Sequence, residues 1–164
     1  MWDVAATGDG ALPPGLQQGS VDIAIMIFIF SALSPEQWDQ AVRNVWNALK
    51  PGGLVLFRDY GRGDLAQVRF KKGRYLEENF YVRGDGTRVY YFEKEELEKI
   101  WSTEAPAECR FEIMNIGDDN RMIVNRQRKL KMYRRWKQGL FRKPSEASAG
   151  SEQRAHVPEL PPMP

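Results

Sequence analysis

Residues 21–57 read VDIAIMIFIFSALSPEQWDQAVRNVWNALKPGGLVLF, and this stretch decides the fold. Its first ten residues, Val21 to Phe30, are apolar without alternation, which is typical of a strand buried on both faces in the middle of a parallel sheet. A second short apolar run, Leu54 to Phe57, closes the stretch. Two strands joined through a helix form a βαβ crossover, which is expected to be right-handed. The sequence therefore predicts an α/β fold.

The segment between the two strands carries the signals of a helix. Ser34 is a good N-cap, Pro35 takes the first helical position, and Gln37 at the third position completes a capping box. Apolar residues at helical spacing form one stripe that can lie on the sheet: Trp38, Ala41, Val42, Val45 and Leu49. The run Lys50-Pro51-Gly52-Gly53 is expected to end the helix.

Further elements follow along the chain. Residues 79–92 (NFYVRGDGTRVYYF) predict a hairpin that turns at Gly84-Asp85-Gly86, and residues 93–101 predict a short helix. Strands over 110–116 and 130–140 are expected to pair antiparallel across a turn at Asp118-Asp119-Asn120. The half-buried face of the second strand is expected to hold Leu130, Met132, Trp136 and Leu140. Residues 144–164, with five prolines, predict a disordered tail.

Composition narrows the class of protein. The 164 residues suffice for one domain, and 42% hydrophobic residues support a packed core. A single cysteine, Cys109, excludes an intramolecular disulfide framework and a cysteine-rich zinc site, and the single histidine, His156, removes histidine-based triads and metal sites from the core. No signal peptide is recognised, and the longest apolar run, residues 23–30, is too short to span a membrane. A soluble, cytoplasmic protein without a metal is expected.

The charge is distributed unevenly. Residues 1–120 carry 13 Lys/Arg and 19 Asp/Glu, whereas residues 121–143 carry 10 Lys/Arg and no acidic residue. A concentrated basic stretch suggests a surface for a polyanion, with nucleic acid as the first candidate. An ordinary solvated basic face is an equally good interpretation at this point.

One expected motif does not occur. An open α/β sheet binds its ligand at the carboxyl ends of its strands, and a glycine-rich turn after the first strand normally begins such a fold. Gly8-Asp9-Gly10 follows only a short apolar stretch, and no long helix follows it. The chain is therefore expected to begin inside a fold.

Several segments together resemble one family. They are VDIAIMIFIFSALSPEQW, LKPGGLVLFRDYG, AQVRFKKG, NFYVRGDGTRVYYF and RKLKMYRRWKQ. The chain is similar, from about residue 2 to residue 144, to the C-terminal half of the eukaryotic methyltransferase-like proteins that make 3-methylcytidine in tRNA. The resemblance implies that residues 1–143 are part of a seven-stranded class I (Rossmann-like) sheet, with S-adenosylmethionine (SAM) as methyl donor and the tRNA anticodon loop as substrate.

The resemblance also implies cofactor contacts. Asp3 stands where the family has an acidic residue beside the adenine of SAM, the backbone N–H of Val4 can reach a ring nitrogen, and Ile27 matches an apolar SAM contact. The alternatives are a turn or cap residue for Asp3 and plain core for Ile27.

Asp59 and Tyr60 are the candidate catalytic residues, because they follow the second strand at the edge where ligands bind. Asp59 is expected to contact the cytosine amino group and Tyr60 to stack on the base. The alternative is that Asp59 pairs with Arg58 or Arg62 and orders the loop.

Basic and aromatic residues nearby are candidates for RNA binding. Arg69, Lys71, Lys72 and Arg74 suit phosphates, and hairpin side chains could stack on loop nucleotides. The predicted RNA-binding set is Arg58, Arg69, Lys71, Lys72, Phe80, Tyr81, Arg83 and Arg88. The alternative is a hairpin that packs on the core through its aromatics.

Three functions remain open. The chain can be part of a tRNA cytidine N3-methyltransferase, inactive alone because the glycine-rich SAM loop is missing. It can be a non-catalytic RNA-binding or partner module that needs another chain, either a protein partner or the missing half, to complete the fold. A class I methyltransferase acting on a small molecule fits the basic and aromatic segments less well.

Overall fold

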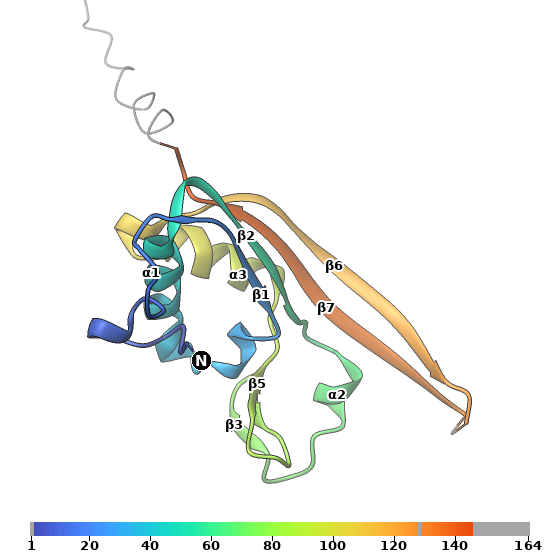
Figure 1. The fold of residues 1–164 in the computed structure, drawn as a ribbon. Helices are drawn as coiled ribbons and strands as arrows, with labels where there is room; N and C mark the ends of the chain where they lie inside the picture. Colours follow the sequence, from blue (N-terminus) through green and yellow to red (C-terminus); the bar gives the residue numbers. More distant parts are fainter. Residues whose placement is uncertain (1, 128, 146–164) are drawn as a thin grey trace, which may run out of the picture.

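A four-stranded mixed sheet forms the centre of the computed structural model, which describes residues 2–127 and 129–145 (Figure 1). The strand order is β1-β2-β7-β6. β1 and β2 are parallel, while β2 with β7 and β7 with β6 are antiparallel. The strands are β1 (Val21–Ile27), β2 (Leu49–Tyr60), β6 (Glu112–Asn125) and β7 (Leu130–Arg142). The predicted α/β sheet and its parallel pair are confirmed.

Helices cover one face of this sheet (Figure 1). A 3-10 turn, Pro35–Gln37, leads into α1 (Trp38–Ala48), and α3 (Lys94–Glu98) continues as a π-helix, Lys99–Thr103. The Oε1 atom of Gln37 accepts a hydrogen bond from the Ser34 N–H at 3.0 Å, which confirms the predicted capping box. The predicted stripe faces the sheet, with Ala41, Val42, Val45 and Leu49 buried. Aromatic rings fill the space beneath: Phe30, Phe57, Trp101 and Phe141.

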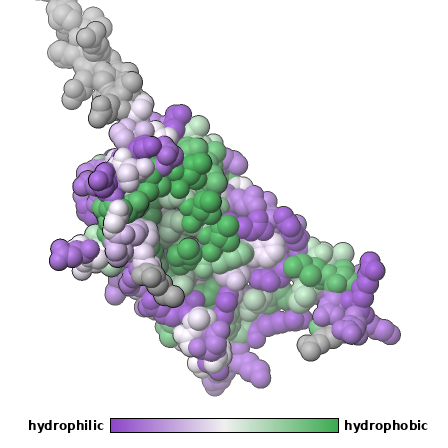
Figure 2. Space-filling view, viewed as in Figure 1, coloured by the Kyte–Doolittle hydropathy of each residue, from purple (hydrophilic) through white to green (hydrophobic). Residues whose placement is uncertain are grey.

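The opposite face of β1 is uncovered. Ile23, Ile25 and Ile27 are 51%, 60% and 52% exposed, while Met26 on the other face is buried. A continuous apolar patch follows this strand in Figure 2. Within the described residues, β1 pairs only with β2, so its outer edge is open. The prediction of a central strand buried on both faces is therefore wrong for this chain, because β1 is an edge strand with one bare face.

The ends of the first two strands also differ from the prediction. β1 ends at Ile27 and not at Phe30, because Phe28 has a left-handed backbone (φ 55°) and residues Phe30–Ala32 form a 3-10 turn. β2 begins at Leu49 and runs on to Tyr60, so Arg58, Asp59 and Tyr60 belong to the strand itself. Their backbones pair with β7, which explains why the strand extends beyond its apolar part.

β6 and β7 form a ribbon that runs on well past the other strands (Figure 1). Asp118, Asp119 and Asn120 pair with β7 residues in mid-strand, so the predicted turn there is wrong. Their carboxylates find cationic partners: Asp118 lies 2.6 Å from Lys137, and Asp119 lies 2.7 Å from Arg58. Met132, Trp136 and Leu140 of β7 are half-buried, as predicted, whereas Leu130 is 39% exposed. The fully buried residues of the strand, Lys137 and Phe141, lie on its other face.

A second, small sheet stands beside the first (Figure 1). It contains β3 (Tyr75–Glu77), β4 (Phe80–Val82) and β5 (Arg88–Tyr90), all antiparallel. β4 and β5 confirm the predicted hairpin, whereas β3 was not foreseen, since all three of its residues are exposed. α2 (Leu65–Val68) connects the two sheets, and 3-10 turns occur at Gly8–Gly10 and Ala107–Cys109.

Two predictions fall largely beyond the described part of the chain. The predicted disordered tail, from residue 146 onward, lies outside it, and so does His156. Within residues 2–127 and 129–145, no helix has both the length and the apolar character that a membrane crossing needs.

Candidate functional site

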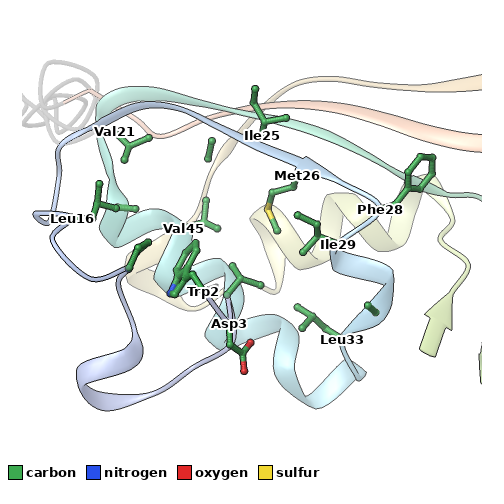
Figure 3. A pocket seen from close by; sticks show the side chains of 15 residues that line it. Trp2, Asp3, Leu16, Val21, Ile25, Met26, Phe28, Ile29, Leu33 and Val45 are labelled. Carbon is green, nitrogen blue, oxygen red and sulfur yellow. The ribbon is translucent and has the colours of Figure 1, made fainter. Parts of the chain in front are cut away.

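An open apolar pocket of about 570 Å³ lies between β1, α1 and the N-terminal segment (Figure 3). Asp3 and Val4 line it together with Trp2, Met26 and Phe28. Two of the three predicted cofactor residues are thus brought to one pocket. Ile27 is not: its side chain is on the bare face of the sheet, beside Leu56 and Leu140.

Local hydrogen bonds fix the two predicted residues in this pocket. The Asp3 carboxylate accepts a hydrogen bond from the Ala5 N–H at 3.0 Å through its Oδ1 atom, as in an Asx-turn. Asn44, fully buried on α1, donates to the carbonyls of Val4 at 2.8 Å and Ala6 at 2.7 Å. A buried amide with two backbone partners holds the segment against α1. Sequence reasoning missed Asn44, since its partners lie about 40 residues away.

Asp59 lies at the carboxyl end of β2 but is completely buried. Its Oδ2 atom accepts a hydrogen bond from the Ser31 N–H at 2.9 Å and its Oδ1 atom accepts one from the Tyr60 N–H at 2.8 Å. Burial raises the pKa of this carboxyl to about 6. Both oxygens therefore hold backbone in place, and neither of the expected pairs forms, because Arg58 binds Asp119 and Arg62 binds Glu96.

Tyr60 is the point where the two sheets meet. Its half-buried ring lies 4.7 Å from the Phe28 ring and 5.7 Å from the Tyr91 ring, between centroids. The guanidinium of Arg83, from the hairpin, lies 5.0 Å from the centre of the Tyr60 ring. The structure thus brings a predicted catalytic residue and a predicted RNA-binding residue into direct contact.

A second aromatic residue, Trp136, lies on the bare face of the sheet and is contacted by three arginines. Arg58, Arg134 and Arg121 place their guanidinium carbons 4.6, 5.2 and 5.8 Å from its ring. Asp119, opposite Trp136 on β6, binds both Arg58 and Arg121. Sequence reasoning placed Arg58 among the RNA-binding residues but missed Trp136, whose role depends on the pairing of strands distant in sequence.

The remaining basic residues fall into two groups. Arg69, Lys71 and Lys72 are exposed on the connection between α2 and β3 and form no ion pair with any residue that the structure describes. Arg88 is exposed but donates to Gln37 Oε1 at 3.0 Å and lies 5.8 Å from the Phe80 ring. The first group is exposed to solvent, whereas Arg88 connects the hairpin to the turn that precedes α1.

The hairpin aromatics pack mainly on one another. Phe80 is 3% exposed and packs on Tyr90, so the prediction that it stacks on nucleotides is wrong. Tyr81 is half-buried and stacked on Phe70, with centroids 4.6 Å apart and planes 12° apart. The alternative of a hairpin packed through its aromatics thus holds for Phe80. The described residues contain no group of three or more acidic, histidine or cysteine side chains placed to hold a metal ion.

Comparison with known proteins shows which sequences this chain resembles. No family model matches it. It is 58% identical over 141 residues to the tRNA(Thr) (cytosine(32)-N(3))-methyltransferase of Saccharomyces cerevisiae, and 51% identical over 143 residues to the tRNA N(3)-methylcytidine methyltransferase trm140 of Schizosaccharomyces pombe. The human tRNA N(3)-cytidine methyltransferase METTL2B is 50% identical over 127 residues. Over most of its length, the chain is therefore similar to a part of the tRNA N(3)-cytidine methyltransferases.

The match covers most of this chain but only a part of each relative. The alignments span 86%, 87% and 77% of the chain and 22%, 44% and 32% of the yeast, fission yeast and human proteins. The predicted resemblance to a part of these proteins is therefore confirmed, and the chain corresponds to less than half of the length of these relatives.

Solved structures confirm the fold. A SAM-dependent methyltransferase from Methanosarcina mazei superposes with a TM-score of 0.57 at 19% identity, over 88% of this chain and 66% of that one. A SAM-dependent methyltransferase from Anabaena variabilis gives a TM-score of 0.51 at 16% identity, over 73% and 48%. The sheet of this chain thus has the fold of a part of a Rossmann-like methyltransferase domain.

Proposed function

We propose that this chain is the part of a SAM-dependent tRNA methyltransferase that holds the adenine of the cofactor and faces the RNA, in an enzyme that forms 3-methylcytidine in the anticodon loop. One observation carries the proposal: the apolar pocket with Asp3 and Val4 adjoins the cluster of Phe28, Tyr60 and Arg83. A methyl donor and a planar acceptor need two such sites side by side.

The pocket suits one end of the cofactor. Apolar walls fit a planar adenine, the Asp3 carboxylate can accept from its amino group, and the Val4 N–H can donate to a ring nitrogen. SAM, when bound, supplies a methyl group on a sulfonium. The described residues offer no glycine-rich turn to this pocket, so the contacts to the ribose and the methionine are expected from the length of the relatives that this chain does not span.

Methyl transfer to cytosine N3 depends mainly on the relative position of the methyl donor and the base. Cytosine N3 carries an uncharged lone pair at neutral pH, so transfer to it needs no prior deprotonation, and alignment of donor and acceptor supplies much of the rate. Asp59 contributes by fixing two backbone N–H groups, those of Ser31 and Tyr60, at the carboxyl ends of both parallel strands. It is a positioning residue in this proposal, and Tyr60 is the residue that stacks on the base.

RNA binding is supported by the exposed basic side chains on the connection between α2 and β3, which form no ion pair within the described residues. Arg69, Lys71 and Lys72 would contact phosphates, and Arg83 would lie beside the target base. Each phosphate contact contributes about one unit to the salt dependence of binding. tRNA is the proposed substrate, as in the names of the relatives.

A chimera tests the proposed activity. We expect the fission yeast relative to keep methylating tRNA cytidine when its matching segment is replaced by residues 2–145, since 51% identity should preserve the interface with the rest of that protein. Formation of 3-methylcytidine is measured in tRNA by mass spectrometry. A folded chimera that binds SAM and tRNA but forms no 3-methylcytidine contradicts the proposal.

The second candidate is a non-catalytic RNA-binding or partner module. The absence of a glycine-rich turn from the described part of the pocket favours it for the chain by itself. In the chimera it predicts unchanged tRNA affinity with loss of methyl transfer. The 164-residue chain alone, which both candidates predict to be inactive, serves as the blank.

A further inference from the structure

The turn that follows β1 places an aromatic residue in an unusual backbone conformation. Phe28 has φ 55°, and Asn79 and Lys129 are the other non-glycine residues of the described chain with positive φ. The left-handed region suits glycine and asparagine but is strained for a bulky side chain. Such strain persists where the surrounding structure enforces it, and it is concentrated at functional sites.

Strand β2 enforces this conformation from both sides of the turn. The Phe28 N–H donates to the Arg58 carbonyl at 2.8 Å, which extends the β1–β2 ladder by one residue. Three residues later the Ser31 N–H donates to the buried Asp59 carboxylate at 2.9 Å. These two hydrogen bonds require the backbone to turn at Phe28. The Phe28 side chain therefore no longer follows the alternation of side chains along β1.

The ring of Phe28 consequently lies at the junction of the two sites. Phe28 lines the pocket that holds Asp3 and Val4, and its ring contacts Tyr60 at 4.7 Å with planes 34° apart. Figure 3 shows it at the end of β1, pointing away from Met26 and Ile29. The ring is half-buried, unlike the fully buried Phe30 two residues later.

Packing does not by itself require this backbone, although the Phe28 ring lies 4.7 Å from the Tyr60 ring and 6.1 Å, edge-on, from the Trp136 ring. A core aromatic needs no left-handed backbone, as Phe30 and Phe57 illustrate. A residue needed only for the turn would be glycine. A strained turn that carries an aromatic ring to the rim of a pocket, beside a second ring, is explained by a ligand that uses the ring.

We propose that Phe28 is a base-stacking residue, which forms with Tyr60 the surface on which the acceptor nucleobase lies next to the pocket. The proposal rests on the proposed function, because it names the residue that receives the cytosine. Phe28 contributes only its ring face, and Arg83, already over the Tyr60 ring, would contact the base from the hairpin.

The test measures the affinity of two RNA probes for the 164-residue chain and for the chimera. One probe is an anticodon stem–loop with cytidine at the position given in the name of the yeast relative, and the other has an abasic nucleotide there. The original sequence is expected to bind the cytidine probe about tenfold more tightly, since one base stacked on an aromatic ring contributes a factor of about 5 to 100 or more in affinity. Phe28→Leu should abolish this ratio, whereas Phe28→Tyr should keep it.

Two controls separate a functional ring from a structural one. Phe111→Leu changes a ring that packs on Trp46 and Trp101 far from Tyr60, so it should lower the melting temperature and leave the ratio unchanged. In the chimera, Phe28→Leu should raise KM for tRNA about tenfold and change KM for SAM much less, because Phe28 is one of fifteen residues that line the cofactor pocket.

The outcomes are distinct. If the original sequence binds neither probe, the proposed function and this inference both fail. If it prefers the cytidine probe and Phe28→Leu keeps that preference while the protein remains folded, only the role of Phe28 is overturned.

Discussion

Asp59 links the pH of the solution to the stability of the turn after β1. Burial raises the pKa of its carboxyl to about 6, above the ordinary value, so the folded protein takes up a proton first as the pH falls. Stability therefore declines as the pH rises from about 4 to about 6 and is level above, and the contribution of this group is about 3 kcal/mol at most. Asp59→Asn cannot ionise, and we expect this decline to be smaller in the variant. Urea unfolding of both proteins across that range checks it, and parallel curves would contradict it.

The same residue shows what the sequence can and cannot predict about a site. Its place at the carboxyl end of a strand follows from the apolar run before it, and the structure confirms that place. Its partners do not follow, because the Ser31 N–H reaches it only after the parallel strands have paired. Arg58 is bound instead by Asp119, a residue 61 positions away whose segment was interpreted as a turn. Contacts across distant strands, rather than local patterns, decide what these charged residues do.

At the scale of elements, β7 depends on a glycine. A Cβ at Gly139 would collide with the ring of Phe141, which folds back over the strand and is fully buried in the core. We expect Gly139→Ala to lower the free energy of unfolding by about 1–3 kcal/mol, as overpacking of a core does. Gly117→Ala, on the neighbouring strand with open space around it, is the matched control and should change stability little. Equal urea midpoints for the two variants would show that Phe141 can move aside.

Elements were predictable where the signals are local. The capping box, the helical stripe and the hairpin turn each lie within a few residues, and all three are confirmed. The ribbon of β6 and β7 was underestimated, because Asp118, Asp119 and Asn120 are typical turn residues whose side chains here bind Lys137 and Arg58 across the sheet. These polar residues continue the strand because their side chains are paired with cationic residues of the neighbouring strands and not only with solvent.

For the whole molecule, the bare face of β1 predicts self-association of the isolated chain. An open apolar edge strand can pair with another copy, and a lysine on such an edge prevents it. We expect the chain to form oligomers and Ile25→Lys, in the middle of the exposed row, to shift it toward monomer. Val68→Lys, 73% exposed but outside the sheet, should have no such effect. Light scattering after size exclusion measures both, and a monodisperse monomer of the original sequence would contradict the expectation.

The open edge of β1 also sets an order in which the sheet exchanges its amide protons. β1 is attached through one ladder, whereas β2 and β7 are each held by a ladder on both sides. Amides that point outward from β1 have no acceptor in the described sheet and should take up deuterium within the dead time of the measurement. Those shared with β2 should follow when β1 peels away, and those between β2 and β7 should exchange last. Deuterium uptake is thus expected first at the outer edge of β1, then between β1 and β2, and last between β2 and β7. The exchange rate of the amides between β1 and β2 would give the free energy of separating β1 from β2.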